Sequence, residues 1–322
     1  MSTEAAKSVH YAGSGAYCYA NSLHMLIQSQ GKEVNTATLE SITLVGNSAS
    51  WYNGLLFFTG TNWKPDKGIS FALDTLEIPF EEHFCPEPTE KDWTESLHIL
   101  EGWLQEGPVL VGPVDMGLLK YLPYHDQVLG VDHYVVVVDY DGEQVVLHDP
   151  EGFPYARLDV EALARAWFAE NISYKRGAYS MWGNLRIDED WTVPDSVFHT
   201  ANAKLGELFA EERANTTLLS GAEAIRHLKT LSPLHDSPKL LNHLINFALP
   251  LGGRRAGDCA LFYSASDPQR AEQKRQMAML FGEFYSLLTS DGTTNDVVSC
   301  IDALAALEEQ FQRCTLASVR SE

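Results

Sequence analysis

Three residues of this sequence have the types and spacing that nucleophilic catalysis requires. The first is Cys18, which lies in "GAYCYANSLHML" shortly after the Gly-Ser-Gly stretch at 13–15. The apolar spacing that follows predicts a helix over about 16–30, so the cysteine falls in the first turn. The partial positive charge of a helix N-terminus stabilises a thiolate, the form of cysteine that attacks carbonyl groups. Cys18 is therefore a candidate nucleophile, and the alternative interpretation is a small buried core residue.

The predicted helix has recognisable ends and one apolar face. Ser14 suits the N-cap and Gly31 suits the C-terminal stop. The apolar stripe consists of Ala16, Ala20, Leu23 and Ile27. Cys18 lies off this stripe, which favours a chemical role over a packing role.

The other two residues flank a predicted β-hairpin, "HYVVVVDYDGEQVVLHDP". A three-residue loop over 140–142, with Gly142 at the position that requires a positive φ, places His133 directly opposite Asp149. Opposed residues of an antiparallel pair share one face with Cβ atoms ~5 Å apart. We therefore predict that Cys18 is the nucleophile, His133 its base and Asp149 the acceptor that orients the imidazole.

This assignment depends on the turn type. A two-residue loop would bring His133 opposite Pro150, and a register slip of one residue would transfer the two roles to Asp132 and His148. Asp149 could also do no more than cap the turn that follows it.

The elements that must position these residues indicate an α+β protein. Helical and strand-like patterns alternate up to about residue 188, and the strands suggest a mostly antiparallel sheet. After "DEDWTVPDS" the strand signals nearly vanish and helix-spaced apolar residues continue to the end of the chain. We predict a catalytic domain over 1–188 and an all-helical region over 189–322 that packs on it.

The order Cys, His, Asp, with the cysteine on an early helix, resembles the papain-like fold. More closely, the chain resembles the butirosin biosynthesis protein H family, cysteine-dependent acyltransferases of antibiotic biosynthesis. The motifs that carry the resemblance are "YCYANSL", "GPVLVGPVDMG", "HYVVVVDYDGE" and "VLHDP". The resemblance implies that an acyl group moves from a carrier-protein thioester to Cys18 and then to an amine acceptor.

One position departs from the papain-like pattern. Such enzymes place a Gln about six residues before the cysteine to complete the oxyanion hole, and position 12 here is Ala. We expect the hole to use the backbone N–H of Cys18, helped by Tyr11, Ser14 or Tyr17.

Two other function classes stay open. A cysteine peptidase or amidase runs the same first half-reaction and differs in letting water resolve the acyl-enzyme. A papain-like framework can also serve as a non-catalytic scaffold, because fold does not fix function. A fixed amine pocket would favour transfer, whereas an open groove for an extended peptide would favour proteolysis.

The charge of the chain bears on its partners. Its 322 residues include 23 Lys and Arg against 44 Asp and Glu, a net charge of −21 that repels nucleic acid and attracts cations. Asp115 and Asp132 are candidate anchors for a cationic acceptor, although Asp115 could be merely solvated. An acidic carrier protein would need a basic patch, for which "GGRR" at 252–255 and "KRQ" at 274–276 are the candidates.

The remaining expectations concern location and cofactors. No apolar run has the ~18 residues of a membrane span, and the polar start lacks a signal-peptide segment, so we expect a cytoplasmic protein. Five scattered cysteines without a CxxC pair favour reduced thiols and no metal or cofactor. The aromatic residues of 45–63 could line a groove or fill a core, and homo-oligomerisation stays open.

Overall fold

The chain divides into two units. A computed structural model describes residue 13 and residues 17–89, 91–215, 217–290 and 292–319. Unit 1 comprises 1–39 and 65–194, and unit 2 comprises 40–64 and 195–322. The sequence-based division at 188/189 differs from this grouping in one respect, because the stretch 40–64 groups with the C-terminal helices. A division that follows chain order alone cannot assign an internal stretch of the first region to the second unit.

Unit 1 is built on a six-stranded sheet. Its strands are β3 (Glu81–Cys85), β4 (Val109–Asp115), β5 (Asp132–Tyr140), β6 (Gln144–Asp149), β7 (Phe153–Asp159) and β8 (Ala178–Gly183). Their spatial order is β3-β8-β4-β5-β6-β7, and every neighbouring pair is antiparallel. The prediction of an α+β unit with an antiparallel sheet is confirmed. Strand β5, which carries His133, lies inside the sheet between β4 and β6.

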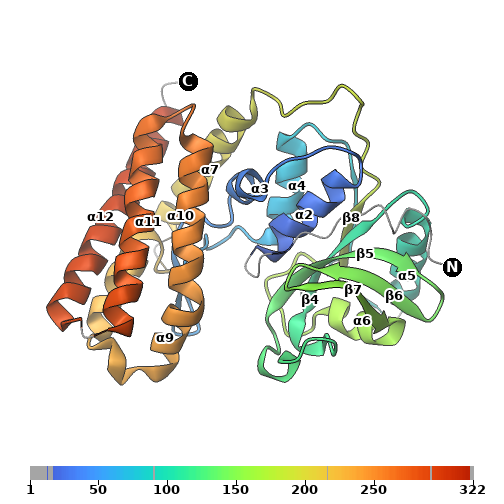
Figure 1. Ribbon diagram of the computed structural model, residues 1–322, viewed down its shortest axis with the longest axis horizontal. Coiled ribbons are helices and arrows are strands. Elements are labelled where there is room, and N and C mark those ends of the chain that lie inside the picture. The colour runs from blue at the N-terminus through green and yellow to red at the C-terminus, as the bar shows by residue number, and fades with distance from the viewer. Residues whose placement is uncertain (1–12, 14–16, 90, 216, 291, 320–322) are drawn as a thin grey trace. The chain divides into compact units, whose positions relative to one another are not determined.

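Helices cover both faces of this sheet. They are α2 (Cys18–Gln28), α4 (Pro65–Thr75), α5 (Asp92–Trp103) and α6 (Val160–Phe168), with short 3-10 turns at Met116–Leu118 and His125–Gln127. Figure 1 shows α2 over one face and α6 under the other. Met25 of α2 packs on Val136 and Val138, whereas Val135 and Val137 join the core with α5 and α6. The unbroken run of valines in β5 fits a strand that is buried on both faces.

Three elements of unit 1 escape the sequence analysis. Strand β3 reads "EEHFC" and forms the sheet edge, where its polar residues are exposed. Strand β7 carries a proline in "FPYARLD" at the opposite edge, and prolines are confined to such positions. Helix α4 begins at Pro65, and proline is favoured at the first position of a helix. Its apolar pattern is short and is interrupted by Gly68. Edge strands and short helices carry weak periodicity.

Unit 2 is a helical bundle with one small hairpin. Its helices are α7 (Val197–Ala214), α8 (Gly221–His227), α9 (Pro238–His243), α10 (Leu249–Tyr263), α11 (Pro268–Thr289) and α12 (Thr294–Val319). Short turns at Leu228–Leu231 and Leu234–Asp236 and a π-helical segment at Leu244–Ala248 connect them. Helix α3 (Thr36–Thr43) spans the boundary between the units. The prediction that the C-terminal region is helical is confirmed.

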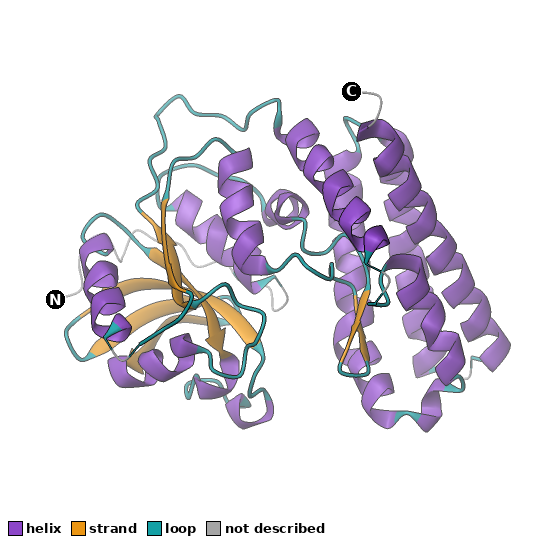
Figure 2. Ribbon diagram, turned by 180° about the vertical axis from the view of Figure 1, so that it is seen from behind, coloured by secondary structure: helices purple, strands orange, loops and turns teal. Residues whose placement is uncertain are grey.

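The hairpin explains why 40–64 belongs to unit 2. Strands β1 (Ser50–Tyr52) and β2 (Leu55–Phe57) pair with each other and lie among the C-terminal helices, as Figure 2 shows. Leu56 and Phe58 are buried in the core of the bundle, and the Phe58 ring meets Phe281 of α11 at 4.5 Å between centroids. For Phe58, the core interpretation is the right one. No helix among the described residues is both long and apolar enough to cross a lipid bilayer.

Candidate active site

Cys18 is the first residue of α2. The preceding residue, Tyr17, takes the N-cap position with left-handed backbone angles, φ 77° and ψ 37°, and its own side chain makes no capping hydrogen bond. Left-handed conformations are rare for aromatic residues and collect at functional sites. Cys18 is half-buried as a residue. The predicted N-cap Ser14, the stripe residue Ala16, and Tyr11 and Ala12 lie outside the described residues.

The helix is fixed to the strand that carries the predicted base. The hydroxyl of Ser22 donates a 3.0 Å hydrogen bond to the backbone carbonyl of Tyr134, the residue after His133. Leu23 and Ile27 are fully buried, as the apolar stripe predicts. Gly31 takes a positive φ of 73° just beyond the helix, which suits a C-terminal stop.

His133 and Asp149 form a buried pair. The imidazole Nε2 of His133 lies 2.7 Å from Oδ1 of Asp149, and both residues are almost completely buried. Burial alone would lower the pKa of His133, but the Asp149 carboxylate outweighs it and holds the pKa well above 6.5. The structure thus brings these two residues together as the sequence analysis predicts.

The hairpin register differs from the predicted one. Val136 pairs with His148 and Tyr140 with Val145, and the register shifts between Val137 and Asp139. If the pairing of Val136 with His148 is extended by one residue to the end of β6, Asp149 lies opposite the residue two places after His133. The contact is therefore diagonal rather than direct, and diagonal neighbours on one face are still within reach of long side chains. Gly142 has the expected positive φ, 99°, and the loop has the predicted three residues, but it covers 141–143 instead of 140–142.

Asp149 has three hydrogen-bond donors. Its Oδ1 also accepts from the backbone N–H of Glu151 at 2.7 Å, and its Oδ2 accepts from the Tyr121 hydroxyl at 2.7 Å. Burial alone would raise the pKa of Asp149, but the charge of His133 and these hydrogen bonds outweigh it, so the pKa is lowered. Tyr121 lies in the loop between β4 and β5, and no local pattern in the sequence singles it out. The turn-capping role that the sequence left open is also present, through Glu151.

The sulfur of Cys18 contacts His133 and the next residue of β5. The thiol of Cys18 interacts with the side chain of His133 and with the backbone N–H of Tyr134, and both interactions act to lower its pKa. Because Nε2 of His133 is engaged by Asp149, the ring nitrogen available to Cys18 is Nδ1. The three predicted catalytic residues are thus joined in one chain, from Asp149 through His133 to Cys18.

The protonation state of Cys18 differs from the sequence-based expectation. Burial raises the pKa of the thiol above 9.0; the hydrogen bond and charge of His133 lower it, and the nearby charge of Asp132 raises it again. A helix N-terminus alone predicts a preformed thiolate. In the structure, burial and a neighbouring carboxylate outweigh that effect, so the thiol form dominates at neutral pH.

The two residues that a register slip would have brought into play have other positions. His148 is buried, and its Nδ1 accepts a hydrogen bond from the backbone N–H of Tyr155 at 3.1 Å. Asp132 is half-buried at the first position of β5, and the hydroxyl of Tyr174 donates a hydrogen bond to it. Neither replaces its neighbour in the chain of contacts, but Asp132 and Tyr174 both lie close enough to Cys18 to interact electrostatically with it.

Asp115 is not an anchor for a cationic acceptor. The residue is fully buried, and Oδ1 accepts from the backbone N–H groups of Gly117 at 3.0 Å and Gly130 at 2.9 Å. Oδ2 accepts from the Asn171 side chain at 2.9 Å. Asp115 therefore closes the loop between β4 and β5, the loop that presents Tyr121 to Asp149.

The two basic segments proposed for carrier docking are also occupied within the chain. Arg255 is buried and its Nε lies 2.7 Å from Oε1 of Glu40. Lys274 is 3% exposed, with its ammonium 3.8 Å from the centroid of the Phe311 ring. These two cations serve the interior of unit 2, whereas Arg254 and Arg275 of the same segments are partly exposed or exposed, so docking of a carrier protein stays a prediction. Among the described residues, no three His, Cys, Asp or Glu side chains are grouped to hold a metal ion.

Known proteins similar to this chain carry the name YobF. A family model described as the YobF C-terminal domain matches residues 215–316, within the helical unit. A protein of Bacillus subtilis (strain 168) named "Uncharacterized protein YobF" is 29% identical over 308 residues, which cover 94% of this chain and 96% of that protein. The similarity thus extends over both units. That name states no activity, so the function is argued from the chemistry of the site.

Proposed function

We propose that this protein is a cysteine-dependent acyltransferase with a papain-like catalytic unit, which moves an acyl group from a thioester to Cys18 and then to a small amine. The observation that carries the proposal is the 2.7 Å contact between Asp149 and His133, together with the interaction of His133 with the Cys18 thiol. The base and the orienting acid are buried, whereas Cys18 as a residue is partly exposed. This distribution suits a nucleophile that must meet a substrate.

In the first half-reaction, the thiolate of Cys18 attacks the carbonyl carbon of the donor thioester. A new C–S bond forms, the C–S bond of the donor breaks, and the His133 imidazolium gives its proton to the leaving sulfur. The first N–H groups of an α-helix have no partner within the helix, and the side chain of the N-cap residue Tyr17 does not cap α2. These groups and the helix dipole are suited to stabilise the negative oxygen of the tetrahedral intermediate.

In the second half-reaction, the acceptor amine attacks the carbonyl carbon of acyl-Cys18. A C–N bond forms, the C–S bond breaks, and the neutral His133 takes the amine proton, which restores the imidazolium and the thiolate. Water at ~55 M competes with the amine, so transfer requires an acceptor that is held close to the thioester. The motif resemblance to the butirosin biosynthesis protein H family and the acidic charge of the chain support an amine acceptor over water.

The donor in this proposal is an acyl carrier protein or another thioester. A small thioester is sufficient for a test, because it does not depend on docking of a carrier protein. All five cysteines are free thiols, which supports a reducing compartment such as the cytoplasm. The assignment to secondary metabolism rests on the motif resemblance.

Acylation by a small thioester tests the proposal. We expect an acyl-N-acetylcysteamine thioester to add one acyl group to the intact protein, and peptide mapping to place it on Cys18. Cys85→Ser is the matched control, because Cys85 is also half-buried and its sulfur lies 3.5 Å from Nε2 of His83. Cys18→Ser should abolish the adduct and Cys85→Ser should retain it.

The fate of the adduct separates the three function classes. Release of an amide after addition of a primary amine supports transfer. Release of the free acid at the same rate with or without amines, together with cleavage of peptide substrates, would establish a hydrolase instead. A protein that forms no adduct on Cys18 from any thioester would be a scaffold, and the proposal would be rejected.

A further inference from the structure

The two oxygens of the Asp149 carboxylate have different partners. Oδ1 lies 2.7 Å from Nε2 of His133 and accepts from the backbone N–H of Glu151 at 2.7 Å. Oδ2 accepts from the hydroxyl of Tyr121 at 2.7 Å. Because the two oxygens of a carboxylate rotate together, a donor that fixes Oδ2 also fixes the direction in which Oδ1 faces the imidazole.

The hydroxyl of Tyr121 is held in place by the loop that carries it, between β4 and β5. Asp115, at the end of β4, accepts from the backbone N–H of Gly117 at 3.0 Å and from that of Gly130 at 2.9 Å, which closes the loop near both of its ends. The ring of Tyr121 packs on Phe153 of β7, with 5.8 Å between the centroids. The phenol is therefore anchored through its ring and its backbone, independently of Asp149.

The Tyr121 hydroxyl is a donor to a buried, charged acceptor. Burial and the negative charge of Asp149 raise the pKa of Tyr121 well above its usual value of 10, so the phenol stays protonated. Asp149 is fully buried, and a hydrogen bond to an ionised acceptor is stronger than one between neutral groups. Removal of this donor leaves a buried carboxylate oxygen without it, and the carboxylate is then free to turn away from His133.

We propose that Tyr121 is a positioning residue of the site. Its hydroxyl holds the Asp149 carboxylate in the orientation in which Oδ1 engages Nε2 of His133, and this leaves Nδ1 of the imidazole for Cys18. Tyr121 acts through Asp149 and not on the reacting atoms. The effect on turnover rests on the proposed acyl transfer, whereas the orientation of His133 is measurable without it.

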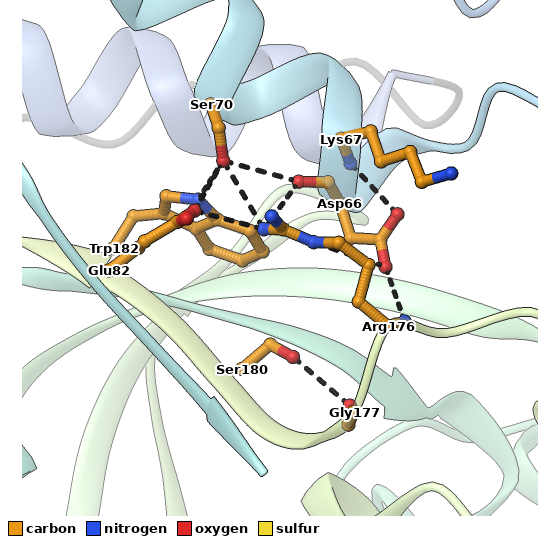
Figure 3. Close-up of polar contacts among 8 residues, drawn as sticks. All are labelled: Asp66, Lys67, Ser70, Glu82, Arg176, Gly177, Ser180 and Trp182. Carbon is orange, nitrogen blue, oxygen red and sulfur yellow. Dashed lines mark hydrogen bonds and ion pairs between the residues drawn. The ribbon is translucent and has the colours of Figure 1, made fainter. Parts of the chain in front are cut away.

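A second polar network of unit 1 provides a structural comparison. Figure 3 shows Ser70 of α4 beside Glu82 of β3, Trp182 of β8 and Arg176. The Ser70 hydroxyl donates to Glu82 at 2.6 Å and accepts from Nε1 of Trp182 at 2.9 Å and from the Arg176 guanidinium at 3.2 Å. These contacts fasten α4 to the sheet and do not include Asp149 or His133. Ser70→Ala therefore weakens the fold of unit 1 without removing a donor from Asp149.

The first test follows the hydrogen bond between His133 and Asp149 by proton NMR of the full chain. A proton shared by an imidazolium and a buried carboxylate resonates far downfield, and its loss in Asp149→Ala assigns it. Tyr121→Phe removes the hydroxyl and keeps the ring, and we expect it to shift this resonance and to broaden it by exchange with water. Tyr140→Phe is the matched control, because its hydroxyl donates to the carbonyl of Gly142 at 3.0 Å at the exposed turn of the same hairpin. Tyr140→Phe and Ser70→Ala should leave the resonance unchanged.

The second test is a double-mutant cycle between Tyr121 and Asp149. We expect Tyr121→Phe to slow acylation of Cys18 by a small thioester about tenfold at an unchanged KM, the loss of one hydrogen bond to a charged group. In an Asp149→Asn background the contact no longer involves a charge, so the same substitution should slow acylation by no more than about twofold. The cycle is repeated with alkylation of Cys18 by iodoacetamide, located by peptide mapping, which requires no acyl transfer.

Two results would overturn the positioning role of Tyr121. One is a Tyr121→Phe protein whose downfield resonance matches that of Tyr140→Phe. The other is an equal loss of rate in the wild-type and Asp149→Asn backgrounds, which would show that the hydroxyl does not act through Asp149. Failure of any thioester to acylate Cys18 in the wild type would instead reject the acyl transfer, while the resonance and the alkylation cycle still report on Tyr121.

Discussion

Substitution of Asp149 tests whether the buried ion pair with His133 holds the candidate site together. In the wild-type protein the carboxylate receives hydrogen bonds from His133, Glu151 and Tyr121, each at 2.7 Å. Asp149→Ala removes the carboxylate that accepts all three hydrogen bonds and leaves a buried imidazolium unpaired. Breaking a buried pair in this way costs about 3–5 kcal/mol.

Asp149→Asn is the milder change. The amide oxygen can still accept from His133 and Glu151, whereas the amide nitrogen faces the Tyr121 hydroxyl, which must then act as the acceptor. Loss of the charge in these hydrogen bonds should cost about 1–2 kcal/mol. Because a neutral amide can still orient the imidazole, we expect this variant to keep part of the acylation rate.

The pH dependence of this loss of stability shows whether the ion pair between Asp149 and His133 causes it. Asp149 has a lowered pKa, so its contribution to stability is present above 3.8 and is lost as the pH falls through the folded-state value. His133 has a raised pKa, so its contribution is complete below 6.5 and is lost as the pH rises toward the folded-state value. The stability difference between the wild type and Asp149→Asn should therefore be largest between these two pH values.

Urea unfolding followed by tryptophan fluorescence measures this difference. Five of the seven tryptophans belong to unit 1, so the signal reports mainly on the unit that contains the site. The control is Asp159→Asn, which alters an exposed carboxylate on the neighbouring strand β7. If Asp149→Asn shows the same loss at every pH, or if Asp149→Ala is no less stable than the control, the ion pair does not organise the site.

Three further predictions concern the scaffold. Asp115→Ala should destabilise unit 1 by about 1–3 kcal/mol and speed protease cleavage in the loop before β5, because the donors of Gly117, Gly130 and Asn171 lose their acceptor. A cleavage rate equal to wild type would contradict its role in closing the loop. Arg255→Ala should lower the free energy of urea unfolding by about 3–5 kcal/mol, whereas Arg254→Ala, which changes a half-buried residue, should lower it by less than about 1 kcal/mol. Equal losses would refute the role of the buried pair between Arg255 and Glu40. A fragment of residues 1–194 should aggregate in size-exclusion chromatography because the hairpin in 40–64 loses its core, and a monodisperse fragment would show that the hairpin folds without the helices.

The hairpin shows what the sequence could predict about the site and what it could not. A β-branched run on each side of Asp141 and Gly142 identifies the two strands and the turn. The register already differs from the predicted one beside the turn, where Tyr140 pairs with Val145, and it shifts by one residue at the bulge between Val137 and Asp139, which no local pattern reveals. The contact between His133 and Asp149 survives this error because a diagonal pair also brings the two side chains together.

For three charged residues, the position in the structure differs from the one that the sequence predicts. The sequence treats Asp115, Arg255 and Lys274 as surface groups that could bind partners, because charged side chains are seldom buried. Each lies in the interior, next to partners that are distant in the chain: Arg255 pairs with Glu40 and Asp115 accepts from Asn171. The pairing of a buried charge is a property of tertiary structure, so composition and spacing cannot reveal it.

The hydroxyl groups of Tyr121 and Tyr174 are two features of the site that the sequence does not reveal. Each belongs to a segment without a strong secondary-structure signal, and each donates to a carboxylate beside the catalytic chain, Asp149 or Asp132. The two carboxylates have opposite effects on the nucleophile: Asp149 favours the imidazolium that stabilises a thiolate, whereas Asp132 opposes the thiolate directly. Asp149 is fully buried, whereas Asp132 is half-buried, so the two opposing carboxylates differ in exposure as well as in their effect on the thiol.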